Sequence, residues 1–344
     1  MPAPMSELLP LDRLEPYLAA HIPGFAGPVS AKKTAQGQSN PTFILTAASG
    51  QYVLRRKPPG DLLKSAHAVD REFRVISALA GTDVPVPGAL HLCEDEDVLG
   101  VVFYVMEFVP SRTWVDPRLL DCTNEDRAAA YDSMNRTLAA LHSVDVATVG
   151  LADYGKPGNY FARQTSRWTG QYRASETETI APMEELIAWL EANMPADDGR
   201  VCLVHGDYRI DNLLFHPERP EVVAVVDWEL STLGHPFADL GGQIMQWSMP
   251  PGEEGRGLMG VDRAPLGIPS DAEYVATYAE RTGLSTPPDL SFPVAFAFFR
   301  MAAIIQGVKK RALDGNASNP ERGLKMGQYV PLFAEAALAR IAKA

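Results

Sequence analysis

Residues 203–215 read LVHGDYRIDNLLF, and residues 222–241 read VVAVVDWELSTLGHPFADLG. Three apolar runs of the kind that form short strands lie in or beside these stretches, at 201–204, 213–215 and 222–226. Asp207 and Asn212 follow the first run, five positions apart, and Asp227 ends the last one. Since packing alone would not place polar residues here, the pattern predicts that the three side chains meet at one end of a small hairpin.

These three residue types suit phosphoryl transfer. Mg²⁺ takes oxygen ligands, often one or two carboxylates plus the phosphates of a substrate, and Asn212 and Asp227 could serve as ligands. The reaction also needs a carboxylate that orients the attacking hydroxyl and accepts its proton, a task for which Asp207 is placed. The order His-x-Asp-x4-Asn with a later strand-terminal Asp is that of protein kinases, with Gly206 in place of their Arg and Asp-Trp-Glu in place of Asp-Phe-Gly.

Together the two stretches closely resemble the aminoglycoside phosphotransferase-like kinase family, including the kinase-like domains fused to some acyl-CoA dehydrogenases. The resemblance covers residues 30 to 311 by the order of motifs. It implies an α+β, two-lobed protein-kinase-like fold, ATP and Mg²⁺ as cofactors, and phosphorylation of a small-molecule hydroxyl. By that resemblance Asp207 is the catalytic base, Asn212 and Asp227 hold the metal, and His205 and Asp239 are structural supports.

The rest of the chain divides into two predicted lobes. Residues 1–108 contain β-type runs at 42–46, 52–55 and 101–108, a hairpin signal at Ser49-Gly50, and one helix through Val69, Phe73, Ile76 and Leu79. This pattern predicts a small N-terminal sheet lobe. Residues 109–344 predict a larger, mainly helical lobe with the catalytic loop, the metal site and the acceptor pocket. Its periodic segments lie at 124–143, 161–176, 180–194, 271–283, 292–311 and 322–343.

The resemblance also implies a phosphate-covering loop in the first lobe. Gly37, Ser39 and Asn40 lie between two predicted strands and offer small residues whose backbone N–H groups could approach phosphate. The G-x-G-x-x-G string of protein kinases is absent from this loop. A Walker A sequence occurs nowhere in the chain, which excludes a P-loop ATPase at the level of motifs.

A cation on the third strand and a carboxylate on the helix complete the implied nucleotide site. Arg55 or Arg56 stands where protein kinases have Lys, and the alternation of side chains along a strand favours Arg55. Glu72 on the following helix is its expected partner. Glu107 and Phe108, at the end of the last strand of the lobe, resemble the hinge whose backbone meets adenine.

Charge and composition restrict the partners. The 344 residues include 31 Lys and Arg against 43 Asp and Glu, a net charge of −12, which leaves no basic surface for a nucleic acid backbone. The three cysteines lack the spacing of a zinc site or a disulfide framework, so we expect a reducing, cytoplasmic compartment. Acidic residues within the first twenty argue against a secretory signal, and residues 292–308 are expected to form a buried helix and not a membrane span. The sequence does not indicate an oligomeric state.

Two acceptors stay open at this point. A polycationic aminocyclitol would be helped by the net acidity and by Asp271, Glu273 and Asp314. A hydroxyacyl-CoA or similar metabolite needs cations, for which the candidates are Arg256, Arg263, Lys309, Lys310 and Arg311. The likeness of residues 227–234 to the dehydrogenase-fused domains favours the metabolite. Residues 250–267, rich in Gly and Pro, are the one expected long loop, as a lid or as an insertion.

Two hypotheses from other classes of protein are also open. A non-catalytic nucleotide-binding module would share the fold, although the joint presence of Asp207, Asn212 and Asp227 speaks against it. A metal-dependent hydrolase would combine these acids with His216 and His235, but the chain has no H-x-H or H-E-x-x-H spacing to support that.

Overall fold

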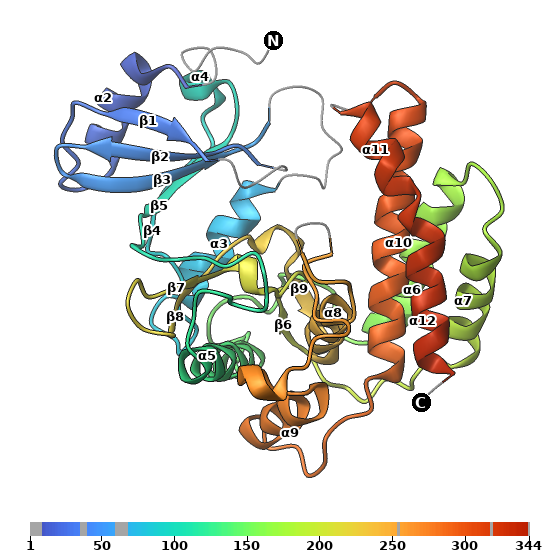
Figure 1. Cartoon of the computed structure of the whole chain (residues 1–344). Coiled ribbons are helices and arrows are strands. Elements are labelled where there is room, and N and C mark those ends of the chain that lie inside the picture. The colour runs from blue at the N-terminus through green and yellow to red at the C-terminus, as the bar shows by residue number, and fades with distance from the viewer. Residues whose placement is uncertain (1–8, 35–39, 59–67, 253–254, 317–318, 343–344) are drawn as a thin grey trace. The chain divides into compact units, whose positions relative to one another are not determined.

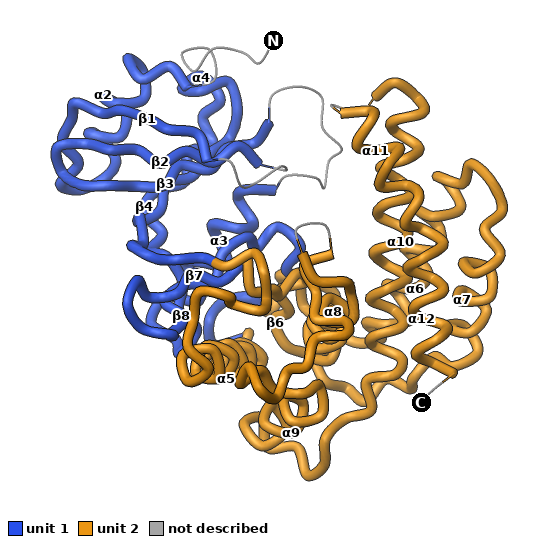
Figure 2. The backbone as a smooth tube through the Cα atoms, in the orientation of Figure 1, with its two compact units in different colours: residues 1–113, 147–151, 212–231 blue, residues 114–146, 152–211, 232–344 orange. Residues whose placement is uncertain are grey.

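The computed structural model describes the chain apart from residues 1–8, 35–39, 59–67, 253–254, 317–318 and 343–344. Backbone contacts group the chain into two compact units (Figure 2). The first contains residues 1–113, 147–151 and 212–231, and the second contains residues 114–146, 152–211 and 232–344. The predicted lobe boundary after Phe108 stays a prediction, since these units follow contacts and assign two later segments to the first unit.

An antiparallel sheet of five strands in the order β1-β2-β3-β5-β4 forms the body of the first unit (Figure 1). Its strands are β1 (Ser30–Lys33), β2 (Thr42–Ala47), β3 (Gly50–Arg56), β4 (Ala89–Cys93) and β5 (Phe103–Glu107). The hairpin predicted at Ser49-Gly50 is confirmed, because Ala47 pairs with Gly50 across β2 and β3. The predicted strands at 42–46, 52–55 and 101–108 correspond to β2, β3 and β5.

The sheet packs against helices. Inward residues of β2, β3 and β5 are fully buried with Leu14 and Leu18 of α2 (Leu11–His21), beside the short α4 (Glu96–Leu99). The predicted helix through Val69 and Leu79 is confirmed as α3 (Val69–Leu79). Its buried face carries one acid, Glu72, among apolar residues, and that acid belongs to the site described below.

A small two-stranded ribbon, with the turn that follows it, places Asn212 and Asp227 in the first unit. β7 (Leu213–Phe215) pairs with β8 (Val222–Val225), and the 3₁₀ turn η2 (Trp228–Leu230) follows. The ribbon is bonded to the first unit at two points, where the backbone N–H of Val225 donates to the Pro85 carbonyl at 2.8 Å and Phe215 bridges Arg112. Asn212 and Asp227 therefore stand on the same unit as Arg55 and Glu72.

The second unit consists mostly of helices. They are α5 (Asn124–His142), α6 (Tyr160–Ser175), α7 (Ala181–Ala192), α8 (Phe237–Trp247), α9 (Asp271–Arg281), α10 (Ser291–Leu313), α11 (Pro320–Gly327) and α12 (Tyr329–Ile341). Figure 1 shows α6, α7, α10 and α12 side by side, in agreement with their packing contacts. The five predicted helices from 124–143 to 292–311 are confirmed, with ends that differ by two residues or fewer.

The helix predicted over 322–343 is wrong as a single element. The structure divides it into α11 and α12, with a break at Gly327 and Gln328. Pro331 explains the break, because a proline ring clashes with the carbonyl four residues earlier and offers no N–H to it. Gly327 also packs closely on Lys309, since a Cβ there would lie 2.6 Å from the Lys309 side chain.

Helix α10 is the core helix of the second unit. In the described part of the chain, it alone has the length and mean hydropathy, 1.5, that would allow a membrane crossing, yet 67% of that stretch is buried inside the protein. Its apolar residues pack against α6, α8, α11 and α12. The prediction of a buried helix at 292–308 is thereby confirmed.

Candidate active site

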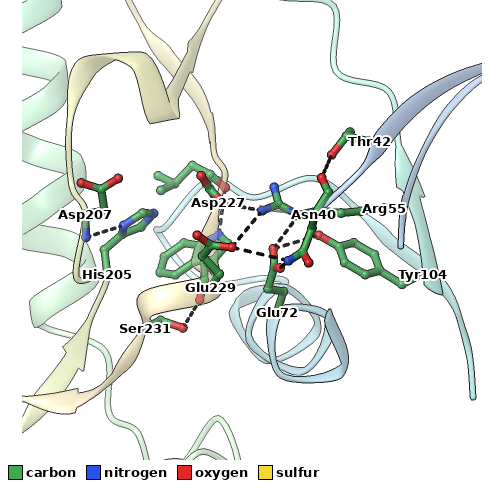
Figure 3. Close-up of polar contacts among 12 residues, drawn as sticks. Asn40, Thr42, Arg55, Glu72, Tyr104, His205, Asp207, Asp227, Glu229 and Ser231 are labelled. Atoms are coloured by element: carbon green, nitrogen blue, oxygen red, sulfur yellow. Dashed lines mark hydrogen bonds and ion pairs between the residues drawn. The ribbon is translucent and has the colours of Figure 1, made fainter. Parts of the chain in front are cut away.

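Asp207 lies on a loop that leaves a buried strand of the second unit. β6 (Cys202–Val204) is fully buried and pairs with β9 (Thr232–Gly234), so the chain emerges from the core at His205. Gly206 follows with φ of +83°, a left-handed conformation that favours glycine. The backbone N–H of Asp207 donates to Nδ1 of His205 at 3.2 Å. Figure 3 shows this contact and the carboxylate of Asp207.

Asp239 of α8 holds this loop by hydrogen bonds to its backbone. Its carboxylate accepts the backbone N–H groups of His205 and Gly206 at 2.6 and 2.7 Å, and it lies 3.2 Å from Nε2 of His142. Nδ1 of His142 is 2.7 Å from the Tyr278 hydroxyl. Burial alone would raise the pKa of Asp239, but these hydrogen bonds and the nearby imidazoles lower it, so the carboxylate stays charged.

Three guanidinium groups surround the catalytic segment within the same unit. Nε of Arg209 lies 3.0 Å from Oδ1 of Asp207, and Arg209 also contacts Asp211 at 3.3 Å. Arg256 contacts Asp211 at 2.8 Å. Arg300 of α10 donates to the carbonyl of Gly206. The sequence indicated Arg256 and Arg300 as residues that could face the acceptor, but not Arg209, and the loop that all three contact could not be predicted without the fold.

A second polar cluster lies in the first unit, around Arg55 of β3 (Figure 3). The Arg55 guanidinium contacts Glu72 at 3.2 Å and Glu229 at 3.7 Å, and it is hydrogen-bonded to Asp227. The predicted Arg55–Glu72 ion pair is therefore present. Asn40 donates to Glu72 at 2.9 Å, and the Tyr104 hydroxyl donates to the same carboxylate at 3.4 Å.

Charge dominates the chemistry of this cluster. Three carboxylates, those of Glu72, Asp227 and Glu229, share the single guanidinium of Arg55. Burial raises the pKa of Glu72 to about 8; Arg55 acts against this rise, and Asp227 and Glu229 add to it. Burial disfavours the charge of Arg55, but Glu72 and Asp227 together raise its pKa above the usual value. The cluster carries an excess of negative charge that a metal cation would offset.

The two predicted metal ligands are neighbours across the β7–β8 ribbon. The backbone N–H of Val226, next to Asp227, donates to the carbonyl of Asn212 at 3.0 Å. Asp227 has a left-handed backbone with φ of 68°, uncommon for a residue other than glycine and often found at functional positions. Their oxygen donors fit Mg²⁺ with few protein ligands. Within the described residues, no group of three or more His, Cys, Asp or Glu could hold a metal.

The remaining predicted nucleotide residues differ in what the structure says of them. Gly37 and Ser39 lie outside the described residues. Asn40 is fully buried and its side chain bonds to carboxylates, so it acts on Glu72 and would meet phosphate only through its backbone. The N–H of Glu107 donates to the Gly88 carbonyl at 2.8 Å, and Phe108 is half-buried. Adenine binding by Glu107 and Phe108 stays a prediction.

The predicted site residues thus fall into two groups. Arg55, Glu72, Asn212 and Asp227 belong to the first unit, while Asp207 belongs to the second. Their convergence on one metal–nucleotide complex stays a prediction. Sequence analysis missed Glu229, which lies beside Asp227 and contacts Arg55. The signal was present in the Asp-Trp-Glu string, where the last residue replaces the glycine of protein kinases.

Comparison with solved structures defines the class of protein. A candidate aminoglycoside phosphotransferase from Ralstonia eutropha superposes with a TM-score of 0.87 at 48% identity, over 97% of this chain and 98% of that one. The aminoglycoside phosphotransferase APH(4)-Ia, in a ternary complex with ADP and hygromycin B, gives 0.62 at 14% identity, over 95% and 98% of the two chains. The second likeness shows the fold, which is that of kinase-like phosphotransferases.

Residues 30–284 match the model of the phosphotransferase enzyme family, and the chain belongs to that family. The protein is therefore a phosphotransferase. Acyl-CoA dehydrogenase family member 10 of Mus musculus is 47% identical over 90% of this chain. The chain spans only 29% of that relative's length.

Proposed function

We propose that the protein transfers the γ-phosphoryl group of ATP to a hydroxyl of a small, anionic metabolite, with Mg²⁺ as cofactor and Asp207 as the base. The metabolite resembles a hydroxyacyl-CoA in carrying both an alcohol and an acidic group. The observation that carries this proposal is the loop at Asp207. Asp239 holds this loop by two hydrogen bonds to its backbone, and arginines surround it. That ATP is the donor is supported by the fold shared with an ADP complex.

In this proposal each group has one task. Arg55, held in place by Glu72, binds the phosphates of the nucleotide. Asn212 and Asp227 hold Mg²⁺, which when bound neutralises phosphate charge. Asp207 orients the acceptor hydroxyl toward the γ-phosphorus and accepts its proton as the new P–O bond forms. ADP leaves with the electrons of the broken bond. Tight positioning and electrostatics supply most of the rate, because phosphoryl transfer needs little covalent help.

Local charge favours an anionic acceptor. Arg209, Arg256 and Arg300 contact the segment from Gly206 to Asp211, which contains two acids. The three guanidinium groups would attract an acidic group of the acceptor at short range. The whole chain is acidic, at −12, but a reacting group responds first to the charges closest to it. The mouse relative, named after acyl-CoA dehydrogenase, points in the same direction.

The competing acceptor is an aminoglycoside, which APH(4)-Ia binds in its complex with hygromycin B. Each acid that the sequence analysis assigned to a polycation already has a partner in this structure. Asp271 pairs with Arg263 and Arg340, Glu273 caps α9 through Ser270, and Asp314 pairs with Lys310. Lys309 and Lys310 are paired as well, with Glu178 and Asp314, whereas Arg256 is paired with Asp211 of the loop that carries Asp207.

The test is a transfer assay with two acceptor panels. Purified protein is incubated with Mg²⁺ and ATP and either hydroxyacyl-CoA thioesters or aminoglycosides, and mass spectrometry detects the phosphorylated acceptor. We expect product in the thioester panel and none in the aminoglycoside panel. Product with aminoglycosides alone would overturn the choice of acceptor. If neither panel yields ADP above the background seen with Asp207→Asn, a non-catalytic nucleotide-binding module is favoured.

A further inference from the structure

Hydrogen bonds hold the part of the 250–267 loop around Arg256 in place. The side-chain amide of Gln246 donates to the carbonyls of Gly255 and Arg256 at 2.7 and 3.2 Å. Leu258 is buried, and its N–H donates to the Trp247 carbonyl at 2.9 Å. The described part of this loop is thus hydrogen-bonded to the end of α8, which indicates a defined loop conformation.

Close packing and backbone strain both concentrate at Arg256. A Cβ on Gly255 would lie 2.1 Å from the Pro250 carbonyl oxygen, and one on Gly257 would lie 2.0 Å from that of Met249. Between these two glycines Arg256 has φ of +49°, a conformation that costs a residue with a Cβ about 1–2 kcal/mol. An arginine at a position where glycine would be relaxed suggests that its side chain is needed there.

That side chain reaches the catalytic loop through a chain of alternating charges. Arg256 contacts Asp211 at 2.8 Å, Asp211 contacts Arg209 at 3.3 Å, and Arg209 contacts Asp207 at 3.0 Å. The exposed fractions of the side chains are 38% for Arg256 and 25% for Arg209, but only 13% for Asp211. Solvent and ligands therefore reach the two guanidinium groups more readily than the acid between them.

A small pocket lies at this point of the second unit. Its lining includes Arg209, Asp211 and Arg256, together with Gln243 and Trp247. Gln243 is 1% exposed, and neither atom of its amide completes a hydrogen bond within the described residues, although the Tyr274 hydroxyl is close by. A buried amide without a bonded partner is costly unless something else satisfies it.

We propose that Arg256 and Arg209 form a subsite for an acidic group of the acceptor, a phosphate or a carboxylate, next to Asp207. Arg256 then determines specificity. Asp211 holds both guanidinium groups in the orientation that receives the anion, and planar guanidinium forks bind such oxyanions in bidentate fashion. The inference rests on the proposed function, since it names the part of the same site that selects the acceptor. It places the acidic group of the substrate within reach of Asp207, and hence close to the reacting hydroxyl.

The test compares Arg256→Gln and Arg256→Lys with Arg173→Gln. Arg173 is a matched control, because it lies in the same unit, is 41% exposed and pairs with two glutamates, Glu176 and Glu184. With an anionic acceptor we expect Arg256→Gln to raise KM about 10–100-fold with little change in kcat. Arg256→Lys should recover part of the loss, and Arg173→Gln should behave as wild type. With an uncharged alcohol acceptor none of the three variants should raise KM.

A binding measurement separates this inference from the proposed function. Calorimetry with CoA, and separately with a short hydroxycarboxylate, in the presence of Mg²⁺ and AMP-PNP shows whether phosphate or carboxylate is the group bound. If wild-type protein binds either anion and Arg256→Gln weakens it at least tenfold, the subsite stands even when no transfer is detected. Equal affinity of wild type and Arg256→Gln for both anions, or an equal rise in KM for charged and uncharged acceptors, would overturn it. Thermal unfolding verifies that each variant is folded.

Discussion

The carboxylate of Asp239 accepts the backbone N–H of Gly206 at 2.7 Å, one residue before Asp207. This bond joins a largely buried helix to the half-buried loop that carries Asp207. Because Asp239 also contacts His142 and the N–H of His205, one side chain sets the backbone path on which the Asp207 carboxylate stands. The position of Asp207 is thus determined in the core of the second unit.

Replacement of Asp239 by asparagine should therefore cost stability as well as activity. The amide nitrogen would face backbone donors, and we expect the free energy of unfolding to fall by about 3–5 kcal/mol, as when a buried charge pair is broken. Urea unfolding measures this loss. Asp314→Asn, which removes an exposed pair with Lys310, is the control and should cost less than about 1 kcal/mol. Similar losses in both variants would mean that Asp239 does not anchor the loop.

The Arg55 guanidinium should matter for nucleotide affinity beyond its part in folding. We expect Arg55→Gln to weaken ATP binding about 10–100-fold, the loss of one or two charge-assisted hydrogen bonds. Since this variant leaves Glu72 buried without its cation, the double variant Arg55→Gln with Glu72→Gln should fold better but bind ATP no better. Calorimetric titration with ATP decides, and full ATP affinity in the double variant would exclude Arg55 from phosphate binding.

The raised pKa of Glu72, about 8, predicts a pH dependence of stability. An acid whose pKa is higher in the folded protein than in the unfolded chain binds a proton on folding between the two values, here between about 4.5 and 8. Wild-type stability should fall relative to Glu72→Gln as pH rises through this window, by about 1.4 kcal/mol per pH unit at most. Urea unfolding of both proteins at several pH values measures the difference. A difference that is constant with pH would mean that Glu72 is already charged near pH 5.

The metal assignment predicts a specific change in magnesium dependence. We expect Asp227→Asn to raise the Mg²⁺ concentration for half-maximal activity at least 10–100-fold, which is what loss of a mere outer-sphere partner costs. Glu229→Gln is the informative comparison, because its carboxylate lies in the same cluster. A larger shift in Glu229→Gln than in Asp227→Asn would transfer the role of ligand to Glu229.

Much of the fold followed from the sequence because its signals were local. The hairpin at Ser49-Gly50 and the helix through Val69 and Leu79 depend on turn residues and on periodicity, which neighbouring residues fix. Helix α8 was not predicted as an element, because Pro236 and two glycines obscure its apolar face. Pro331 signals the break between α11 and α12, but apolar periodicity alone predicts one continuous helix there.

The polar site was predictable where motif spacing determines it and unpredictable where tertiary contacts do. Asp207, Asn212 and Asp227 were named from the spacing within two stretches of sequence. The Arg55–Glu72 pair was named from the family resemblance, with strand alternation favouring Arg55 over Arg56. The contacts of Arg256 and Arg300 with the catalytic loop connect residues 45 and 94 positions apart in the chain. No periodicity reports such pairings, because only the packing of α8 and α10 brings these side chains to that loop.

In the proposed reaction Asp207 directs a substrate hydroxyl at the γ-phosphorus of ATP. The decisive experiment measures the rate of phosphorylated acceptor formation by wild type and Asp207→Asn at saturating Mg²⁺ and ATP, with nucleotide affinity measured in parallel. We expect the variant to bind ATP as wild type does but to lose about 10²–10⁴-fold in kcat, the usual contribution of a positioned base. A variant that retains most of the wild-type rate of product formation would contradict it.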